Sequence, residues 1–294
     1  MNNPLCVKRM MALKFTGIQF IGLSILLVCC IGCDYPQDPE HKQKLEPQTL
    51  TQEDIVRQDS IITQYLTHGA LKHDLYSVEW QEELDKGLAI DSTIAYLWQQ
   101  KAMPLFKQGK YEAGMEFIDK AVYYNPERWQ DYRAFIKCIF AKTYKEAIAD
   151  FKAYKAQFGY GFVMDHSLDF YIGLSYLQLN DFVTAEAYFK DDYHYQLARY
   201  GKDWLHHLDL FYYGISLYEQ KKYKAAIERF DLALELYPDF SEVQLFKAEC
   251  LRKLGRVEQA NALRALGIIN GKKGNTINED NVIYERYPYQ IRWN

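Results

Sequence analysis

The sequence of 294 residues predicts an all-α protein built from repeated pairs of antiparallel helices. Three observations lead to this prediction. A pattern of small and large apolar residues recurs at fixed offsets, short polar turns divide each unit in two, and proline ends the second half of two units. With 49 % hydrophobic and 25 % charged residues, the composition is that of a globular rather than a disordered chain.

Residues 1–32 are predicted to be an export signal. An uncharged apolar run over residues 18–31 follows three basic residues, and no acidic residue precedes Asp34. A basic start followed by about fourteen apolar residues is the layout of a secretory signal. The run is also shorter than the ~20 residues that a bilayer-spanning helix needs.

The end of this run, Cys30-Ile-Gly-Cys33, resembles a bacterial lipoprotein signal. The resemblance implies cleavage after Gly32 and lipidation of Cys33, which would anchor the chain in the outer or inner membrane of a bacterial cell envelope, facing the periplasm. A plain signal or membrane anchor and a metal or redox thiol pair are the alternatives, although a redox pair needs a folded βαβ context. Residues 33–50 are rich in proline and predict a flexible tether.

Residues 51–94 are predicted to form an N-terminal helical cap or a degenerate repeat. Leu84 and Gly87 stand 34 residues before Ile118 and Ala121, which belong to the first clear unit. A leading repeat needs a polar outer face because it has no neighbour on one side.

The clearest repeat unit begins at Gly214. The residues 3, 9, 12, 16, 19 and 24 positions later are Leu217, Tyr223, Ala226, Phe230, Ala233 and Pro238. The unit that begins at Ala102 has, at the same offsets, Leu105, Tyr111, Gly114, Ile118, Ala121 and Pro126. The small residues are the lead residue and the one 12 positions later, Gly214 and Ala226 in one unit and Ala102 and Gly114 in the other. They let the two helices of a unit approach closely, and the large residues fill the adjoining space.

Further units begin at Ile136, Gly173 and Ala248, so the steps between units are 34, 37, 41 and 34 residues. This pattern resembles the tetratricopeptide repeat family, whose period is about 34 residues. The resemblance implies a right-handed superhelix, an α-solenoid, of about five helix pairs over residues 95–267. The longer steps predict insertions, one of them at 191–204, and the Ile136 unit matches after one deletion. Pro104 is expected to bend a first helix.

Residues 268–294 are predicted to be a linker followed by an aromatic C-terminal tail. Tyr284, Tyr287, Tyr289 and Trp293 alternate along it. Such a segment is expected to be ordered, either as a flap over the last repeat or within the groove of the array itself.

The sequence does not predict an enzyme, a metal site or a cofactor. It has no metalloprotease, nucleophile-elbow or phosphate-loop motif. One insertion contains five side chains that could bind a metal: Asp191, Asp192, His194, His206 and His207. It is interpreted as a solvated polar loop. An enzyme that uses this insertion is a third possible class of function.

The family layout implies a partner-binding groove on the first helix of each pair. By residue number, its predicted lining is Tyr96, Gln99, Met103, Phe106, Arg133, Lys137, Phe140, Phe170, Leu174, Phe211, Ile215, Tyr218, Leu245, Glu249 and Arg252. The sequence therefore predicts a lipid-anchored, non-catalytic adaptor or assembly factor that binds a protein or peptide. A carbohydrate-binding accessory lipoprotein of a nutrient-uptake system is the alternative. The net charge of −4, with no basic stripe, gives no reason to expect nucleic acid.

Overall fold

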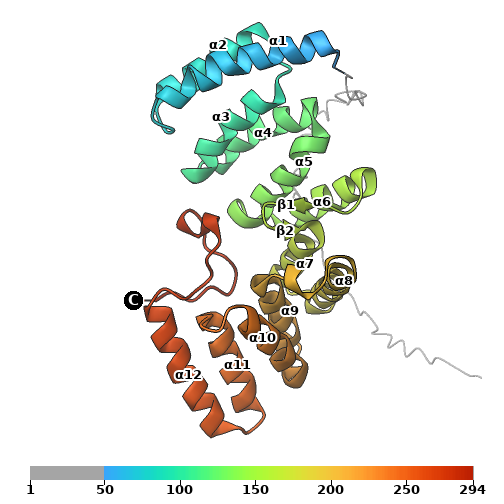
Figure 1. Cartoon of the computed structure of the whole chain (residues 1–294), viewed down its shortest axis with the longest axis vertical. Coiled ribbons are helices and arrows are strands. Elements are labelled where there is room, and N and C mark those ends of the chain that lie inside the picture. The colour runs from blue at the N-terminus through green and yellow to red at the C-terminus, as the bar shows by residue number, and fades with distance from the viewer. Residues whose placement is uncertain (1–49, 294) are drawn as a thin grey trace, which may run out of the picture. The chain divides into compact units, whose positions relative to one another are not determined.

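Twelve α-helices follow one another along residues 50–293, which are the residues that this computed structural model describes (Figure 1). Neighbouring helices pack as pairs, α3 with α4 and so on to α11 with α12, and each pair packs against the next. The predicted signal peptide, Cys33 and almost all of the predicted tether lie outside the described residues. Within the described part, no helix is both long and apolar enough to cross a bilayer.

The N-terminal segment contains α1 (Gln52–Ile62), a π-helical turn (Thr63–Thr67), a 3-10 turn (Ala70–Lys72) and α2 (Val78–Ile90). The first helices of the pairs are α3 (Ala95–Lys107), α5 (Pro126–Phe135) with a π-helical turn (Ile136–Phe140), α7 (Leu168–Gln178), α9 (His207–Glu219) and α11 (Ser241–Lys253). The second helices are α4 (Tyr111–Tyr124), α6 (Tyr144–Phe158), α8 (Phe182–Tyr200), α10 (Tyr223–Leu236) and α12 (Val257–Lys272). Strands β1 (Phe162–Val163) and β2 (His166–Ser167) and 3-10 turns (Lys202–Trp204, Asp280–Ile283) complete the list.

Small residues are required where the two helices of a pair approach each other. A Cβ atom built on Gly214 would lie 2.4 Å from the ring of Phe230, and one on Gly173 would lie 3.0 Å from the ring of Phe189. Real Cβ atoms essentially never come as close as the first of these distances. The repeat pattern in the sequence therefore records a packing requirement, as predicted.

The irregular steps between units have local structural causes. In the Ile136 unit, the N–H of Ala141 bonds to the carbonyl of Ile136, five residues earlier. Such a π-helical turn shifts the register of the side chains, and it coincides with the deletion needed to match this unit. The insertion before α7 forms the short antiparallel hairpin of β1 and β2, in which Phe162 pairs with Ser167.

The second insertion corrects a prediction. Asp191, Asp192 and His194 were expected in a solvated loop, but they lie on α8, which is 19 residues long. Asp192 is only 2 % exposed. Its carboxylate accepts bonds from Gln196 Nε2 at 2.7 Å and from the Tyr160 hydroxyl at 2.8 Å, so the extra turns of α8 are held by a buried polar network.

Pro104 lies within α3, and the helix continues through it. Proline has no N–H, so the carbonyl of Gln100 lacks its helical partner. The indole N–H of Trp80, on α2, donates to this carbonyl at 3.2 Å. Trp80 also belongs to a separate apolar cluster that packs α1 and α2 onto α3. The proline thereby supplies an attachment point for the N-terminal segment.

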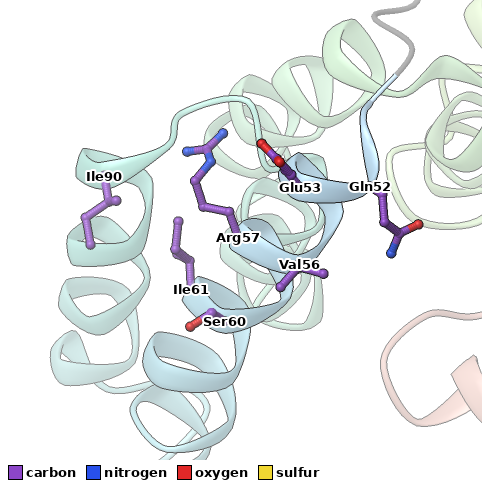
Figure 2. A pocket seen from close by; sticks show the side chains of 7 residues that line it. All are labelled: Gln52, Glu53, Val56, Arg57, Ser60, Ile61 and Ile90. Carbon is purple, nitrogen blue, oxygen red and sulfur yellow. The ribbon is translucent and has the colours of Figure 1, made fainter.

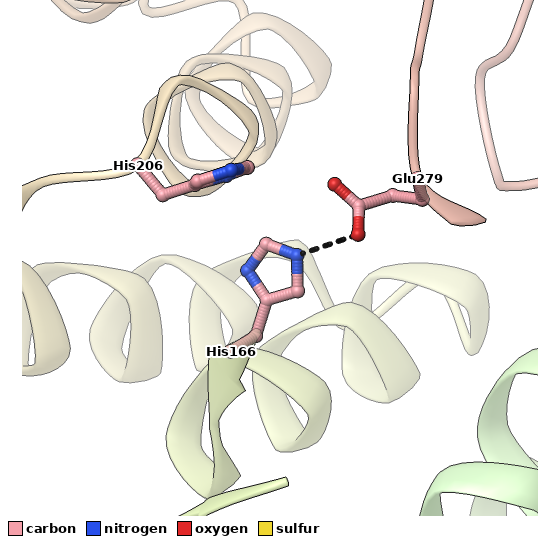
Figure 3. A group of neighbouring side chains, drawn as sticks. All are labelled: His166, His206 and Glu279. Carbon is pink, nitrogen blue, oxygen red and sulfur yellow. Dashed lines mark ion pairs between the residues drawn. The ribbon is translucent and has the colours of Figure 1, made fainter. Parts of the chain in front are cut away.

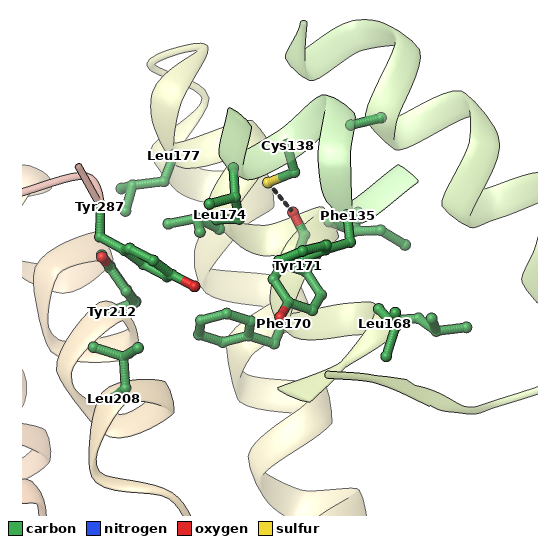
Figure 4. Packing of buried hydrophobic residues seen from close by; sticks show 14 of the residues in the cluster. Phe135, Cys138, Leu168, Phe170, Tyr171, Leu174, Leu177, Leu208, Tyr212 and Tyr287 are labelled. Carbon is green, nitrogen blue, oxygen red and sulfur yellow. Dashed lines mark hydrogen bonds between the residues drawn. The ribbon is translucent and has the colours of Figure 1, made fainter. Parts of the chain in front are cut away.

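The main apolar core runs from α3 to α11, continues into the C-terminal segment at Ile277 and Tyr287, and includes many of the tyrosines of the chain. At its centre, Tyr171 and Tyr212 are completely buried, and Tyr287 from the far end of the chain is 2 % exposed (Figure 4). The ring of Tyr171 stacks on that of Phe151 at 5.5 Å between centroids. These three tyrosines therefore serve packing.

Candidate functional site

The C-terminal tail, residues 274–293, lies on the inner face of the array, which we define as the surface formed by the first helices α3, α5, α7, α9 and α11 (Figure 1). Its first contact is a backbone bond from the N–H of Ser241, at the start of α11, to the carbonyl of Asn275 at 2.9 Å. Ile277, two residues further on, is 1 % exposed. Of the two placements that the sequence left open, the structure has the tail in the groove of the array.

Glu242 on α11 holds two separate parts of the tail. The side chain is completely buried. Its Oε1 atom accepts the hydroxyl of Thr276 and, at 3.2 Å, the backbone N–H of Ile291, while Oε2 accepts the Ser241 hydroxyl at 2.8 Å. A buried carboxylate is costly unless it is hydrogen-bonded. The tail therefore supplies partners that Glu242 needs.

Aromatic residues fix the far end of the tail. The Tyr287 ring is inserted into the core beside Tyr212, whose hydroxyl donates to the carbonyl of Pro288 at 2.8 Å (Figure 4). The Tyr289 hydroxyl donates to Glu219 on α9, also at 2.8 Å. The tail is thus held by backbone bonds, by buried rings and by polar side chains together.

Trp293, the last described residue, packs against α12. A Cβ atom added to Gly271 would lie 2.1 Å from the Trp293 ring, so a side chain at this position would displace the indole. Because glycine leaves this space, the end of the tail rests directly on helix backbone.

The α3 and α5 part of the inner face is less completely covered. Lys107 on α3 lies 5.0 Å from the ring centroid of Tyr284, and Lys142 lies 2.5 Å from the Glu285 carboxylate. A cleft of about 460 Å³ remains between tail and helices. Its lining residues are Met103, Phe106, Lys107, Tyr132, Phe135, Ile136, Phe140, Met164, Asp280, Asn281, Ile283 and Tyr284.

Under the middle of the tail, His166, His206 and Glu279 converge; we call them the His–Glu cluster (Figure 3). One potential ligand atom from each lies within 4.8 Å of the others. His166 is on β2, next to Ser167, whose hydroxyl caps α7 by accepting the N–H of Phe170. His206 occupies the N-cap position of α9, and its Nδ1 accepts the N–H of Leu208 at 3.3 Å.

The ring of His166 is clamped by two carboxylates. Its Nδ1–H donates to Asp209 Oδ1 at 2.6 Å, and Gln196 donates to the other oxygen of Asp209 at 3.3 Å. Its Nε2 lies 3.4 Å from Glu279 Oε2, and this completely buried nitrogen has no hydrogen-bond partner among residues 50–293. The N-termini of α7 and α9 favour negative charge at this place.

Burial and nearby carboxylates have opposite effects on the pKa values of His166, His206 and His207. Burial alone would lower the pKa of His166, but Asp209 and Glu279 raise it to about 10. Burial lowers the pKa of His206, and burial with the proximity of His206 lowers the pKa of His207 to about 4. In the absence of another cation, His166 is therefore charged at pH 7 and the other two histidines are neutral.

Part of the predicted groove lies inside the array in this conformation. Residues of the prediction with at most 6 % exposure are Gln99, Phe106, Phe140, Phe170, Leu174, Phe211 and Ile215. They pack within and between the helix pairs. Phe106 lies against Gly114 of the same pair, and Phe170 contacts Tyr212 on the next first helix. A partner could not reach the innermost of them without rearrangement, and their use in binding stays a prediction.

The charged predicted residues are already paired. Arg133 donates from Nε and Nη2 to Asp150 on α6, at 2.7 and 2.8 Å, and Lys137 donates to the same carboxylate at 2.8 Å. Arg252 and Glu249 pair with each other on α11 at 2.9 Å. These cations are neutralised by the array itself.

The rest of the predicted lining is partly accessible. Tyr96 is 40 % exposed and stacks on Trp129, with 6.0 Å between centroids. Tyr218 is half-buried beside Phe246, and Leu245 contacts Gly267. Met103 lines the cleft at Tyr284. The structure therefore spreads the predicted residues over several surroundings and does not unite them in one open groove.

Residues that sequence reasoning missed are those that contact the tail. Glu242 and Tyr212 face it from the first helices, and His166 meets Glu279. Glu242 lies on the same face of α11 as the predicted Leu245 and Glu249, one turn before Leu245, where the predicted positions begin. His166 and Glu279 carry no local motif, so no sequence signal joined them.

Two further clefts lie near the N-terminal segment. One, of about 530 Å³, is lined by Gln52, Glu53, Val56, Arg57, Ser60, Ile61 and Ile90 on α1 and α2 (Figure 2). The other, of about 730 Å³, contains the Tyr96–Trp129 stack and lies beside the start of α5. Neither contains the His–Glu cluster.

The two cysteines of the described residues are poorly suited to nucleophilic chemistry. Cys138 and Cys250 are buried free thiols, and burial raises the pKa of each to about 12. The thiolate is the reactive form. Both therefore act as small core residues.

Comparisons with known proteins agree with the helix-pair architecture. Sequence models described as tetratricopeptide repeat match residues 95–128 and 217–266. A search of curated proteins found no match. Among solved structures, a tetratricopeptide repeat protein from Parabacteroides merdae is 15 % identical, with a TM-score of 0.55, 74 % of this chain and 84 % of that chain covered.

Two other solved structures share the fold. PilF of Pseudomonas aeruginosa is 16 % identical, with a TM-score of 0.55, and PilW, described as a widely conserved type IV pilus biogenesis factor, is 13 % identical, with a TM-score of 0.54. Each match covers 74 % of this chain and 92 % of the other. At these identities the likeness shows the fold alone. Two stretches of the chain therefore match tetratricopeptide repeat models, and its stacked helix pairs have the fold of tetratricopeptide repeat proteins.

Proposed function

We propose that this protein is a non-catalytic adaptor or assembly factor that binds an extended segment of a protein partner on the inner face of its repeat array. The observation that carries the proposal is the tail, because the inner face already holds one extended segment of polypeptide. Tyr212 donates to a tail carbonyl, and Glu242 accepts a tail N–H. Backbone bonds of this kind are independent of side-chain identity, while ring pockets supply specificity.

The tail also indicates the chemistry of the partner. Its buried anchor is Tyr287, and its acidic residue Glu285 meets Lys142. A partner segment that replaces the tail would need an aromatic anchor, a free backbone carbonyl for Tyr212 and an acidic group near Lys142. Buried aromatic anchors contribute most of the energy in such interfaces.

The proposed place of action is a bacterial cell envelope. The support is the lipoprotein-like sequence that ends at Cys33, which would leave the repeat array tethered to a membrane by residues 34–50. PilW, whose fold is similar, is described as a pilus biogenesis factor. We extend from it only the idea of an assembly role.

The partner proposal is tested by cross-linking in envelopes of cells that produce either the full chain or a chain lacking residues 279–294. Products are identified by mass spectrometry, and circular dichroism verifies that the shortened chain is folded. We expect a partner cross-linked to α9 or α11 in greater yield with the shortened chain, and competition by a synthetic peptide of residues 279–294. Equal yields, with no competition by the peptide, would contradict binding on the inner face.

The anchoring proposal has a separate test. Replacing Cys33 by Ser removes the sulfur that would carry the lipid. Metabolic labelling with a fatty-acid analogue should label the unchanged chain and not the C33S variant. Equal labelling of the two chains would exclude Cys33 as the modified residue.

A further inference from the structure

The His–Glu cluster has the ligand types and spacing of a metal centre. Two imidazoles and one carboxylate are a known ligand set for zinc, which binds nitrogen and oxygen at about 2.0–2.2 Å. Two ligand atoms on one tetrahedral zinc are therefore roughly 3.4 Å apart. The Nε2 atom of His166 and Oε2 of Glu279 lie 3.4 Å from each other, and His206 brings the third ligand atom within 4.8 Å.

The orientation of His166 is that of a metal ligand. Metal-bound histidines usually donate their second ring N–H to a carboxylate, which fixes the ring. Asp209 accepts the Nδ1–H of His166 at 2.6 Å, so Nε2 points toward Glu279 (Figure 3). This nitrogen is completely buried, and within the described part of the chain it makes the 3.4 Å contact with Glu279 but no hydrogen bond. Buried polar atoms without partners are rare, and an ion is one of the explanations for them.

The charge of the surroundings also favours a cation. Asp209 and Glu279 are both largely buried, and among the described residues neither forms an ion pair with a lysine or an arginine. A single protonated imidazole offsets only one of the two charges. A divalent ion would neutralise both carboxylates while His166 and His206 served as neutral ligands.

We propose that His166, His206 and Glu279 bind one divalent transition-metal ion of the zinc class, with Asp209 orienting His166. The ion takes the place of the proton on His166 Nε2. A solvent molecule completes four-fold coordination.

The ion would fasten three distant segments to one another. His166 belongs to the hairpin before α7, His206 to the start of α9, and Glu279 to the tail. Glu279 is the ligand that connects the tail to the array. Metal binding therefore holds the tail on the inner face and keeps the α7–α9 part of that face closed to other segments.

The test uses the full chain, freed of metal with a chelator and titrated with Zn²⁺ by calorimetry and with Co²⁺ by visible spectroscopy. The variants are Glu279→Gln and His206→Gln, which remove ligands outside the core. The matched control is His207→Gln, whose Nε2 lies 3.1 Å from Asn278 and outside the cluster. Co²⁺ distinguishes this site from the cysteines, because thiolate ligands give an intense charge-transfer band and nitrogen and oxygen ligands do not.

We expect one tightly bound ion per unchanged chain, with Co²⁺ bands of a tetrahedral site without thiolate. Each ligand variant should weaken binding at least tenfold, and the His207→Gln control should not. Hydrogen exchange of residues 279–293 should slow when zinc is added to the unchanged chain, and not in Glu279→Gln. No stoichiometric binding, or equal affinity in the ligand variants, would overturn the site; unchanged exchange in the tail would overturn its fastening by the ion.

Discussion

The two halves of the inner face have the same repeat geometry but different occupants. In the C-terminal half, formed by α7, α9 and α11, the tail buries Tyr287 and bonds to Tyr212 and Glu242. In the N-terminal half, formed by α3 and α5, the tail contributes Tyr284 and Glu285 beside a cleft. One half is filled by the tail, and the other is only partly covered by it.

This difference shows that the repeat fold alone does not determine which part of the inner face is accessible to another polypeptide. Two cations of the N-terminal half, Arg133 and Lys137, are paired within the array, where they share Asp150. Glu242 in the C-terminal half takes bonds from the tail instead. The C-terminal half therefore depends on its occupant for stability, whereas the N-terminal half does not.

Deleting residues 279–294 should have the largest effect. It removes the buried Tyr287 ring and one tail partner of Glu242, so we expect the free energy of unfolding to fall by about 4 kcal/mol or more. Urea unfolding measures the total, and hydrogen exchange locates it. Exchange should accelerate in α9 and α11 but little in α3 and α4. An equal loss of protection in both halves would contradict the comparison.

Two tyrosines of the tail form a matched pair. Tyr287→Ala empties a buried position and should cost about 2–4 kcal/mol. Tyr284→Ala, in the N-terminal half, removes a partly exposed ring next to Lys107 and should cost less than about 1 kcal/mol. Thermal unfolding of both variants compares the halves directly. Similar losses would mean that the tail binds uniformly along its length.

The N-terminal half should show its own dependence on pH through Asp131 on α5. Burial raises the pKa of this carboxyl to about 6, although the N–H of Tyr132 and Arg128 oppose the rise. The unfolded state, with a pKa near 3.8, loses its proton first, so the contribution of Asp131 to stability is complete below about pH 4 and is lost as the pH rises to about 6.

Asp131→Asn should therefore gain stability relative to the unchanged chain between pH 4 and pH 7, by about 1–2 kcal/mol after allowance for partial solvation. Asparagine retains an oxygen for the N–H of Tyr132. Urea unfolding at the two pH values gives the difference. A gap between the two proteins that does not widen with pH would argue against a buried, protonated Asp131.

The smallest effect is expected for the ion pair between Lys142 and Glu285. Lys142 is 41 % exposed, and exposed ion pairs stabilise proteins little. Lys142→Ala should lower the free energy of unfolding by less than about 1 kcal/mol. A loss as large as that of Tyr287→Ala would mean that the N-terminal half also anchors the tail firmly.

Much of the fold could be predicted because repeat packing leaves local traces. Gly214 and Phe230 touch across a helix pair and stand at a fixed spacing, so each unit repeats the same signal. The insertion at 191–204 was predicted by length, but its helical form was not, because the burial of Asp192 depends on Tyr160 and Gln196 from other turns.

Most residues of the candidate site could not be predicted from the sequence. Family spacing identifies which face of a first helix is inward, but it does not tell what covers that face. The contact of His166 with Glu279 depends on where the tail returns, and that is decided by many weak contacts along the whole array. The aromatic alternation of the tail did indicate order, and this is where the sequence came closest.

Because the tail is covalently attached to the array, it competes with any other segment for the inner face and weakens the apparent affinity of that competitor. A tethered segment acts at an effective concentration of the order of millimolar, whatever the amount of protein in the cell. If docking is favoured by about 3 kcal/mol, fewer than one molecule in about a hundred is open at any moment, and a competitor's apparent dissociation constant rises by the same factor. Peptides that bind weakly and non-specifically would not displace the tail. A specific partner would need a high local concentration, either because it is abundant or because it is held near the array.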